Sequence, residues 1–327
     1  MKLLLELSME CQSLARAEAL SAATALGGSP KVIREEPGIL IIETDADPEA
    51  LGNRLGLCHY VNEWLSSCGE GDVEYTAKGI DVMGPIRVRS TEIGERSLDL
   101  ASTTRKVGAI IGKTRGVDLH RPATEIRVVF SEGAHFARVV SSIDRSSFEK
   151  RKNRYMPFVY PASLHPKYAR ALVNLTQVPV GGRLLDPFCG TGAILAEGSM
   201  IGLKAIGTDF SERMIEGSRK NLDHLKLSAD LKLCDVGEIP HTVGRVDGIA
   251  TDPPYGRSTS TDGERIPELY RRSFDAFSAV LKSGAKIAIV VPDIDLVRNQ
   301  EGFRLLESHR LWVHRSLTRN FCVFEST

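Results

Sequence analysis

Hydrophobic positions follow two different patterns along the chain, and the pattern changes near Lys167. Before this residue, short apolar runs are mixed with helix-like stretches. The runs LLLEL, GILIIET, IRVRS, TEIRVVF and HFARVVS predict strands at 3–7, 38–44, 86–90, 124–130 and 135–141. Helical periodicity predicts helices over 12–26, 47–56 and 97–112, the first stopped by GGSP and the last by Gly112. The N-terminal half is therefore expected to be α+β.

From Lys167 onward, apolar strands alternate with helical stretches. RLLD, KAIGTD, LKLCD, VDGIATD and KIAIVV predict strands at 183–186, 204–209, 231–235, 246–252 and 286–291. Such alternation implies right-handed crossovers and a parallel sheet covered on both faces, which is an α/β fold. RLWVHRS (310–316) and NFCVFE (320–325) are separated by only a few residues, so we expect a closing antiparallel hairpin.

The two patterns are joined by residues 144–166, which contain three prolines, several aromatic residues and a basic cluster. This composition predicts an ordered but irregular connector. His165, directly before Pro166, is expected to cap the helix that follows.

Composition excludes some classes of protein. No apolar run approaches the ~18–20 residues that a membrane span needs, and Glu6 and Glu10 interrupt the apolar start before it could form a signal peptide. The 6 cysteines include no C-x-x-C pair, which argues against a zinc site and against a disulfide framework. We therefore expect a cytoplasmic protein with reduced thiols, no membrane association and no metal site.

Charge is unevenly distributed although the formal net charge is zero. Residues 1–80 carry 6 basic and 13 acidic side chains, residues 81–170 carry 17 and 9, and residues 171–327 carry 19 and 20. A cationic middle segment is typical of a module that meets phosphates, although a solvated basic face without a partner would look the same.

Carboxylates end four successive predicted strands: Asp186, Asp209, Asp235 and Asp252. Ligands of open α/β sheets bind beyond these carboxyl ends. A buried unpaired carboxylate costs several kcal/mol, so four of them indicate a ligand rich in hydrogen-bond donors.

The loop after the first of these strands, DPFCGTG (186–192), contains Gly190 and Gly192, which allow a tight turn and a close ligand approach. A dinucleotide fingerprint would need glycine or alanine where Leu195 stands, and Asp186 would repel a pyrophosphate. S-adenosylmethionine, which is cationic and carries no phosphate, fits better. Asp186 and the glycine backbone would hold its methionine end, Asp209 its ribose and Asp235 its adenine. The candidate cofactor-binding residues are Asp186, Phe188, Gly190, Thr191, Gly192, Asp209 and Asp235.

TDPPYG (251–256) ends the fourth strand and suggests the chemistry. An aromatic exocyclic amine is a poor nucleophile because its lone pair is delocalised into the ring. The Asp252 carboxylate and the Pro253 carbonyl could accept its two N–H bonds and return the lone pair to nitrogen. Pro253 and Pro254 fix the backbone and donate nothing, while Tyr255 offers a face for base stacking. The candidate catalytic residues are Asp252, Pro253, Pro254 and Tyr255.

The four-part pattern resembles the class I amino-methyltransferases, which use D-P-P-Y on both DNA adenine and RNA guanine. Residues 103–130, TTRKVGAIIGKTRGVDLHRPATEIRVVF, resemble the THUMP domain of tRNA-modifying enzymes. HPKYARALVNL (165–175) resembles the linker-to-helix stretch of the archaeal tRNA guanosine-10 N2-methyltransferases. The sequence is similar to that family over most of its length.

This resemblance implies a Rossmann-like methyltransferase domain with a seven-stranded mixed sheet at 167–327, preceded by an N-terminal α+β subdomain (1–60), a THUMP RNA-binding domain (61–145) and a linker (146–166). It implies a monomeric catalytic chain that methylates N2 of tRNA guanosine 10 once or twice. Eukaryotic members, and some archaeal ones, work with a small zinc-ribbon activator protein. The RNA-binding candidates are Arg105, Lys106, Lys113, Arg115, Arg121, Lys150, Arg151 and Lys152.

Three alternatives stay open at this point. The same chemistry could act on another tRNA guanosine or on ribosomal RNA, because THUMP domains are shared among such enzymes. A DNA adenine-N6 methyltransferase is disfavoured by the N-terminal module. A non-catalytic RNA-binding scaffold is disfavoured by the intact acids of the four strand ends.

Overall fold

The computed structural model describes residues 1–94, 98–161, 163–255, 263–314 and 317–327. The predicted helix start at Ser97, the glycine of TDPPYG and positions 315–316 of the closing hairpin lie outside these residues. The chain forms two compact units, the first from residues 1–12, 28–53 and 58–143, and the second from residues 13–27, 54–57 and 144–327. Two segments from the N-terminal part of the chain thus belong to the C-terminal unit. The four functional domains of the sequence analysis remain a prediction.

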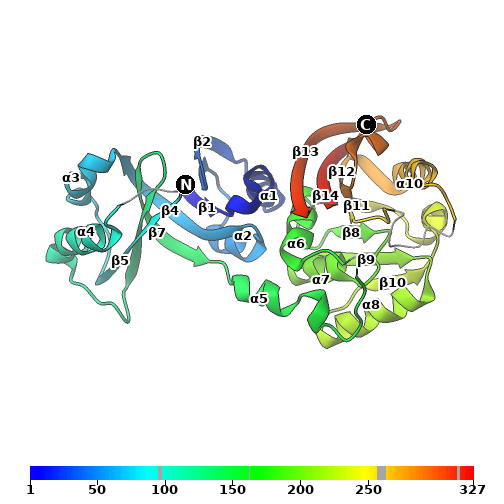
Figure 1. Cartoon of the computed structure of the whole chain (residues 1–327), viewed down its shortest axis with the longest axis horizontal. Helices are drawn as coiled ribbons and strands as arrows, with labels where there is room; N and C mark the ends of the chain where they lie inside the picture. Colours follow the sequence, from blue (N-terminus) through cyan, green and yellow to red (C-terminus); the bar gives the residue numbers. More distant parts are fainter. Residues whose placement is uncertain (95–97, 162, 256–262, 315–316) are drawn as a thin grey trace. The chain divides into compact units, whose positions relative to one another are not determined.

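The first unit contains a seven-stranded sheet in the order β2-β3-β1-β4-β7-β6-β5 (Figure 1). Its strands are β1 (Lys2–Leu7), β2 (Lys31–Glu36), β3 (Ile39–Glu43), β4 (Cys58–Cys68), β5 (Ile86–Glu92), β6 (Thr124–Phe130) and β7 (Ala134–Ser142). β5 and β6 are parallel, whereas β4 pairs antiparallel with both β1 and β7. The sequence analysis missed β2 and β4, because β2 is largely exposed and charged and β4 has polar residues on both faces.

Short helices accompany this sheet: η1 (Met9–Cys11), α2 (Pro48–Arg54), η2 (Glu70–Asp72), α3 (Val73–Ala77) and α4 (Leu100–Arg115). Val107 and Ile111 of α4 pack on Val88, Ile126 and their neighbours in a buried cluster. The prediction that α4 ends at Gly112 was wrong. The helix continues to Arg115, and Gly116, whose φ of 77° suits a residue without a side chain, ends it.

The second unit contains a seven-stranded mixed sheet in the order β10-β9-β8-β11-β12-β14-β13. Its strands are β8 (Arg183–Asp186), β9 (Lys204–Asp209), β10 (Asp230–Leu233), β11 (Val246–Thr251), β12 (Leu281–Val291), β13 (Phe303–His314) and β14 (Leu317–Ser326). The first five strands in this order are parallel, and β14 pairs antiparallel with β12 and β13. The predicted α/β sheet with a closing hairpin is confirmed.

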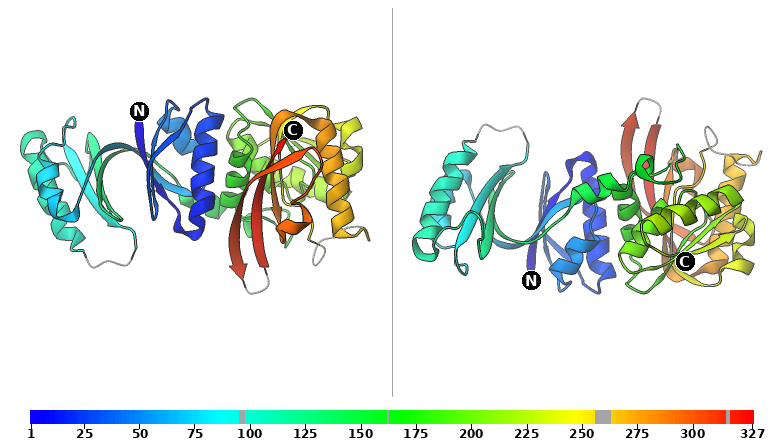
Figure 2. Two further views of the ribbon diagram at one scale, coloured as in Figure 1. Left: turned by 90° about the horizontal axis from the view of Figure 1, so that it is seen from above. Right: turned by 90° about the horizontal axis from the view of Figure 1, so that it is seen from below.

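Helices cover both faces of this sheet. The helices assigned to this unit are α1 (Gln12–Ala25), α5 (Arg145–Lys150), η3 (Asn153–Tyr155), α6 (Pro166–Leu175), α7 (Ala193–Met200), α8 (Glu212–His224), η4 (Val236–Glu238), α9 (Ile239–Thr242), α10 (Ile266–Val280) and η5 (Ile294–Leu296), and α6, α7, α8 and α10 are among those that contact the strands. Figure 2 shows the green helices α6 to α8 on one side of the sheet and the orange helix α10 on the other. The connector, predicted to be irregular, contains α5, and His165 caps α6 by accepting a hydrogen bond from the Lys167 amide, as expected.

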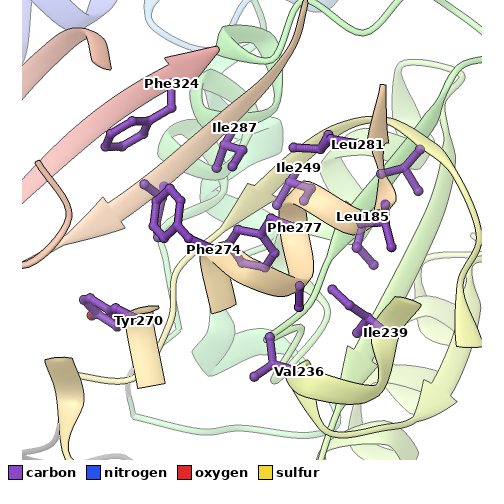
Figure 3. Packing of buried hydrophobic residues seen from close by; sticks show 14 of the residues in the cluster. Leu185, Val236, Ile239, Ile249, Tyr270, Phe274, Phe277, Leu281, Ile287 and Phe324 are labelled. Carbon is purple, nitrogen blue, oxygen red and sulfur yellow. The ribbon is translucent and has the colours of Figure 1, made fainter. Parts of the chain in front are cut away.

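The larger apolar core of this unit lies between α10 and the strands β8, β11, β12 and β14 (Figure 3). Phe274 is at its centre, with ring centroids of Phe277, Phe303 and Phe324 at 5.6, 5.2 and 5.2 Å. A second cluster joins α7 and α8 to β9. Packing on both faces holds the carboxyl ends of the parallel strands at one edge of the sheet. None of the described helices has both the length and the apolar composition needed to span a bilayer.

Candidate active site

A cavity of about 950 Å³ lies at the carboxyl ends of β8, β9 and β11. It is lined by Tyr160, Pro161, Ser163, Leu164, Asp186, Phe188, Cys189, Gly190, Thr191, Ala193, Ile194, Asp209, Phe210, Ser211, Met214, Asp252, Pro253, Pro254, Tyr255, Pro292, Asp293, Leu317, Thr318 and Arg319. Three of the four predicted strand-end acids are brought together here. The volume is in the range expected for a small-molecule site.

Asp186 ends β8 and is 1% exposed. Burial raises its pKa to about 7, although its Oδ1 accepts hydrogen bonds from the Thr251 hydroxyl (2.8 Å) and the Phe188 amide (3.2 Å). The charges of Asp252 and Asp209 raise it further. A carboxyl group in this state gains free energy from a cationic ligand, because the ligand would compensate the charge that burial disfavours.

Side chains of α8 fix the conformation of the loop that follows Asp186. Gly190 and Gly192 have φ values of 50° and 80°, which the left-handed turn requires. The Ser218 hydroxyl donates to the Gly190 carbonyl (2.8 Å), and the Asn221 amide donates to the Thr191 carbonyl (3.0 Å). Gly190 and Thr191 line the cavity, whereas Gly192 is the N-cap of α7 and is not among the lining residues.

Asp209 ends β9 and accepts hydrogen bonds from the amides of Gly190 (3.1 Å) and Ser211 (2.9 Å). Burial raises its pKa above the usual range, and these two amides oppose the rise. The next residue, Phe210, lines the cavity with 46% of its surface exposed. An exposed phenyl ring beside a carboxylate suits a nucleoside, whose base can stack while its hydroxyls donate to the acid.

Asp235 is not among the residues that line the cavity. β10 ends at Leu233, and Asp235 caps the short helix η4 through the Gly237 amide. Arg272, which also pairs with Glu264 (2.7 Å), forms an ion pair with Asp235. Burial alone would raise the pKa of Asp235, but hydrogen bonds from Arg272 and Gly237 outweigh it and hold that pKa below the usual range. Its predicted contact with adenine therefore remains a prediction.

Asp252 follows β11 and faces the cavity with 12% of its side chain exposed. Burial raises its pKa to about 6, while the Arg319 guanidinium and a hydrogen bond from the Tyr255 hydroxyl lower it. The Tyr270 hydroxyl donates to the Pro254 carbonyl (3.2 Å), which anchors the turn to α10. Pro253, Pro254 and Tyr255 all line the cavity, as the motif predicts.

An archaeal enzyme matches almost the whole chain. A tRNA (guanine(10)-N2)-dimethyltransferase of Methanothermobacter thermautotrophicus is 35% identical over 345 aligned positions, which cover 99% of either chain. The chain belongs to the tRNA (guanine(10)-N2)-dimethyltransferase family. A second family member, from Pyrococcus abyssi, is 31% identical and the match covers 96% of both chains. The resemblance predicted from the sequence is confirmed.

Two further comparisons concern the C-terminal part and the fold of the chain. The model of the family described as "RMKL-like, methyltransferase domain" matches residues 153–320. The crystal structure of TrmN from Thermus thermophilus superposes with a TM-score of 0.57 over 100% of both chains at 23% identity, which shows the shared fold.

The matched region begins in the connector, and the connector contributes to the cavity in a way that the sequence analysis missed. Tyr160, Pro161, Ser163 and Leu164 line it, and the hydroxyls of Ser163 and Thr191 are 2.7 Å apart. The prolines and aromatic residues of this stretch were the available signal, because a merely solvated linker does not need them. Three cavity residues of β14 were also not predicted: Leu317, Thr318 and Arg319. The sequence of a hairpin strand does not by itself indicate which part of the protein the strand faces.

The RNA-binding candidates lie in both units. Arg105, Lys106, Lys113 and Arg115 are exposed on α4, but Lys106 pairs with Glu74 (2.7 Å) and Arg115 with Asp81. Arg121 and Lys150 are exposed as well, and Lys152 pairs with Glu149. Arg151 is different. Its side chain is 13% exposed, lies over Phe148 and pairs with Glu197 at 2.8 Å, so the structure places most of it inside the second unit.

Proposed function

We propose that this protein transfers methyl groups from S-adenosylmethionine to the exocyclic N2 amine of guanosine 10 in tRNA. The observation that carries the proposal is the near-full-length match to a tRNA (guanine(10)-N2)-dimethyltransferase, combined with a D-P-P-Y carboxylate that faces the cavity. The relative is named a dimethyltransferase, so two successive transfers to the same nitrogen are part of the proposal.

The residues of the cavity fit the methyl donor. Asp186 and Asp209 have raised pKa values, and their hydrogen-bond donors among the described residues are neutral hydroxyl and amide groups. A bound sulfonium and ammonium would supply the missing positive charge. Asp209 would accept from ribose hydroxyls, and the exposed Phe210 ring would pack on the adenine. When bound, the donor supplies an electrophilic methyl group.

Asp252 and Pro253 act on the target base. The Asp252 carboxylate accepts one N–H of the amine and the Pro253 carbonyl accepts the other, so the nitrogen lone pair turns from the ring toward the incoming methyl carbon. The bound donor would supply the methyl group to this nitrogen, and the Asp252 carboxylate would accept the amine proton that the methylated nitrogen releases. Proton acceptance of this kind contributes ~10²–10⁴ in rate. A pKa of about 6 leaves Asp252 ionised at neutral pH and makes it a better base than an exposed aspartate.

The remaining parts of the proposal concern partners. Exposed basic residues of α4 would contact tRNA phosphates, so binding should weaken as salt rises. We propose a monomeric, cytoplasmic catalytic chain that a small zinc-ribbon protein could activate. Size-exclusion chromatography of the purified chain, alone and with a co-expressed zinc-ribbon protein, tests both points.

The decisive test uses tRNA transcripts and a labelled methyl donor. Label should enter a transcript with guanosine at position 10, and replacement of that guanosine by adenosine should abolish incorporation. Nuclease digestion and mass spectrometry should identify N2-methylated and N2,N2-dimethylated guanosine. Undiminished labelling of the adenosine-10 transcript would show that another guanosine is the target.

A further inference from the structure

Arg319 lies beside the D-P-P-Y turn, although it comes from the closing hairpin. Its side chain lines the cavity, is 12% exposed, and places Nη2 at 3.9 Å from Asp252 Oδ2. This separation is longer than a hydrogen bond. The carboxylate and the guanidinium therefore attract each other but keep bonding capacity for a third group.

The Arg319 guanidinium interacts with the Tyr255 hydroxyl but is incompletely satisfied. Its Nε is buried and has no hydrogen-bond partner among the described residues. Buried donors are normally paired. Unpaired arginine nitrogens also occur at Arg54 and Arg170, but Arg319 lines the cavity, where a ligand can bring an acceptor to its guanidinium. The backbone is held in place by the neighbouring Asn320, whose amide donates to the carbonyls of Val291 (3.2 Å) and Pro292 (2.9 Å). The side chain is thus presented from a fixed strand.

Guanine carries the matching pattern along its Watson–Crick edge. From N2 through N1 to O6 this edge presents a donor, a donor and an acceptor. A carboxylate next to a guanidinium presents two acceptors and then a donor. Enzymes that act on an extruded base read it through hydrogen bonds to this edge. The pairing of Arg with guanine O6 is common because the guanidinium is always charged and donates in a fixed geometry.

We propose that Arg319 is the specificity-determining residue of the site, and that it donates to O6 of the target guanine while Asp252 accepts from N2 and N1. The inference rests on the proposed function and deepens it. Adenine presents an acceptor at N1 and no O6, so it would oppose the Asp252 carboxylate and leave Arg319 without a partner. The same D-P-P-Y turn thereby becomes selective for guanine.

The test compares two bases at position 10 in the full-length enzyme. Ligated tRNA carries either guanosine or 2-aminopurine riboside, and both keep the reactive amine. 2-Aminopurine lacks O6 and also the N1 hydrogen, so the wild-type preference reports on both contacts, whereas the change caused by an Arg319 variant reports on O6. Wild-type kcat/KM should favour guanosine by at least tenfold. Arg319→Gln should lower kcat/KM for guanosine by about 10- to 100-fold, as expected for a lost hydrogen bond from a charged donor. It should leave 2-aminopurine nearly unchanged, so the preference for guanosine should fall by the same factor, and the remainder is the contribution of the N1 hydrogen.

Two controls separate recognition from stability. Arg304→Gln removes an exposed arginine of the same hairpin, which pairs with Glu325 (2.6 Å), and should leave both rates and their ratio unchanged. Arg319→Lys keeps the charge and a donor, so it should restore part of the preference even if the glutamine variant folds poorly.

Three results would overturn the inference: equal methylation of both bases by the wild type, an equal loss on both bases in Arg319→Gln, or a shifted pH profile with the preference intact. The last would mean that Arg319 acts only by keeping Asp252 ionised. If adenosine at position 10 leaves wild-type labelling undiminished, the proposed target fails instead. The same base replacement at the true target then tests Arg319 separately.

Discussion

Two groups of buried polar and charged side chains in the second unit differ in where their hydrogen-bond and ion-pair partners are found. The strand-end carboxylates are Asp186, Asp209 and Asp252, and they face a cavity. The buried ion network joins α1, α2, α5, α6 and α7 and consists of Glu18, Arg54, Arg151, Arg170, Asn174 and Glu197. Within the described chain, the cationic partner of the first group is Arg319, which lies 3.9 Å from Asp252, whereas the second group contains its own arginines.

The carboxylates of the network have their partners within it, whereas Arg54 Nη1 and Arg170 Nε are buried without a hydrogen-bond partner among the described residues. Glu197 accepts from Arg151 at 2.8 Å and from Arg170 at 2.7 Å. Glu18 accepts from the amides of Gly56 (2.8 Å) and Leu57 (2.7 Å) and from Asn174 (2.9 Å). Arg54 donates to Asn174 Oδ1 at 2.8 Å and to the Val178 carbonyl at 2.6 Å. These bonds attach the segments 13–27 and 54–57 to the rest of the second unit.

A raised pKa does not distinguish the two groups. Burial raises the pKa of Glu18 to about 7 even though three donors oppose it, and burial raises that of Asp186 to about 7 as well. The difference lies in the space beside each carboxylate. Glu18 is enclosed by its donors, whereas Asp186 borders a cavity large enough for a ligand. Geometry, and not titration, therefore separates a structural charge from a functional one.

The largest effect is expected at Asp252. Asp252→Ala should lower kcat by about 10²- to 10⁴-fold, because it removes the proton acceptor and one acceptor of the amine. Affinity for the methyl donor and for tRNA should be retained in equilibrium binding. Asp247→Ala, at the opposite end of β11 and paired with Lys282, is the matched control and should keep its turnover. Equal turnover in the two variants would remove Asp252 from the mechanism.

A substitution that breaks the buried ion network should lower the stability of the protein rather than the rate of the chemical step. Glu197→Ala leaves Arg151 and Arg170 buried without their carboxylate, which costs about 3–5 kcal/mol of unfolding free energy. Urea denaturation measures the loss. Asp275→Ala breaks an exposed pair with Arg271 and should leave the midpoint nearly unchanged. A Glu197→Ala protein as stable as the control would show that the network does not hold the unit together.

Next in size is the loss of donor affinity at Asp186. Asp186→Asn keeps an acceptor for Thr251 but removes the charge, so the dissociation constant for S-adenosylmethionine should rise by about 10- to 100-fold. Isothermal titration calorimetry gives this value directly. The unfolding midpoint should not fall at neutral pH, because a buried charge has been removed. A loss of stability with intact affinity would assign Asp186 to the structural group.

The smallest effect is a pH dependence of that affinity. Only the ionised Asp186 attracts a cation, and its pKa of about 7 means that the ionised fraction shrinks as pH falls. From pH 7.5 to pH 6 the affinity should decrease by about tenfold. In Asp186→Asn the same pH change should have much less effect. Identical pH profiles for the two proteins would contradict the raised pKa.

Local patterns explain which parts of the site were predicted. Asp186, Asp209 and Asp252 each follow an apolar run, and parallel strands bring such positions to one edge. Asp235 has the same pattern, yet its strand ends two residues earlier. Its carboxylate instead accepts a hydrogen bond from Arg272, which is 37 residues away in the sequence. The network was not predicted, because Arg54 and Asn174 are 120 residues apart and Glu18 and Asn174 are 156 residues apart.

Periodicity and motif spacing alone sufficed for the α/β class, the parallel strands with their closing hairpin and the position of the D-P-P-Y turn at a strand end, because each depends on neighbours within a few residues. Three-dimensional packing was needed to place Arg319 beside Asp252, to line the cavity with the connector and to bury Glu18 among distant donors. Each of these arrangements joins residues that are far apart in the chain and depends on which faces of helices and strands pack together. The sequence around a residue does not indicate such a distant partner.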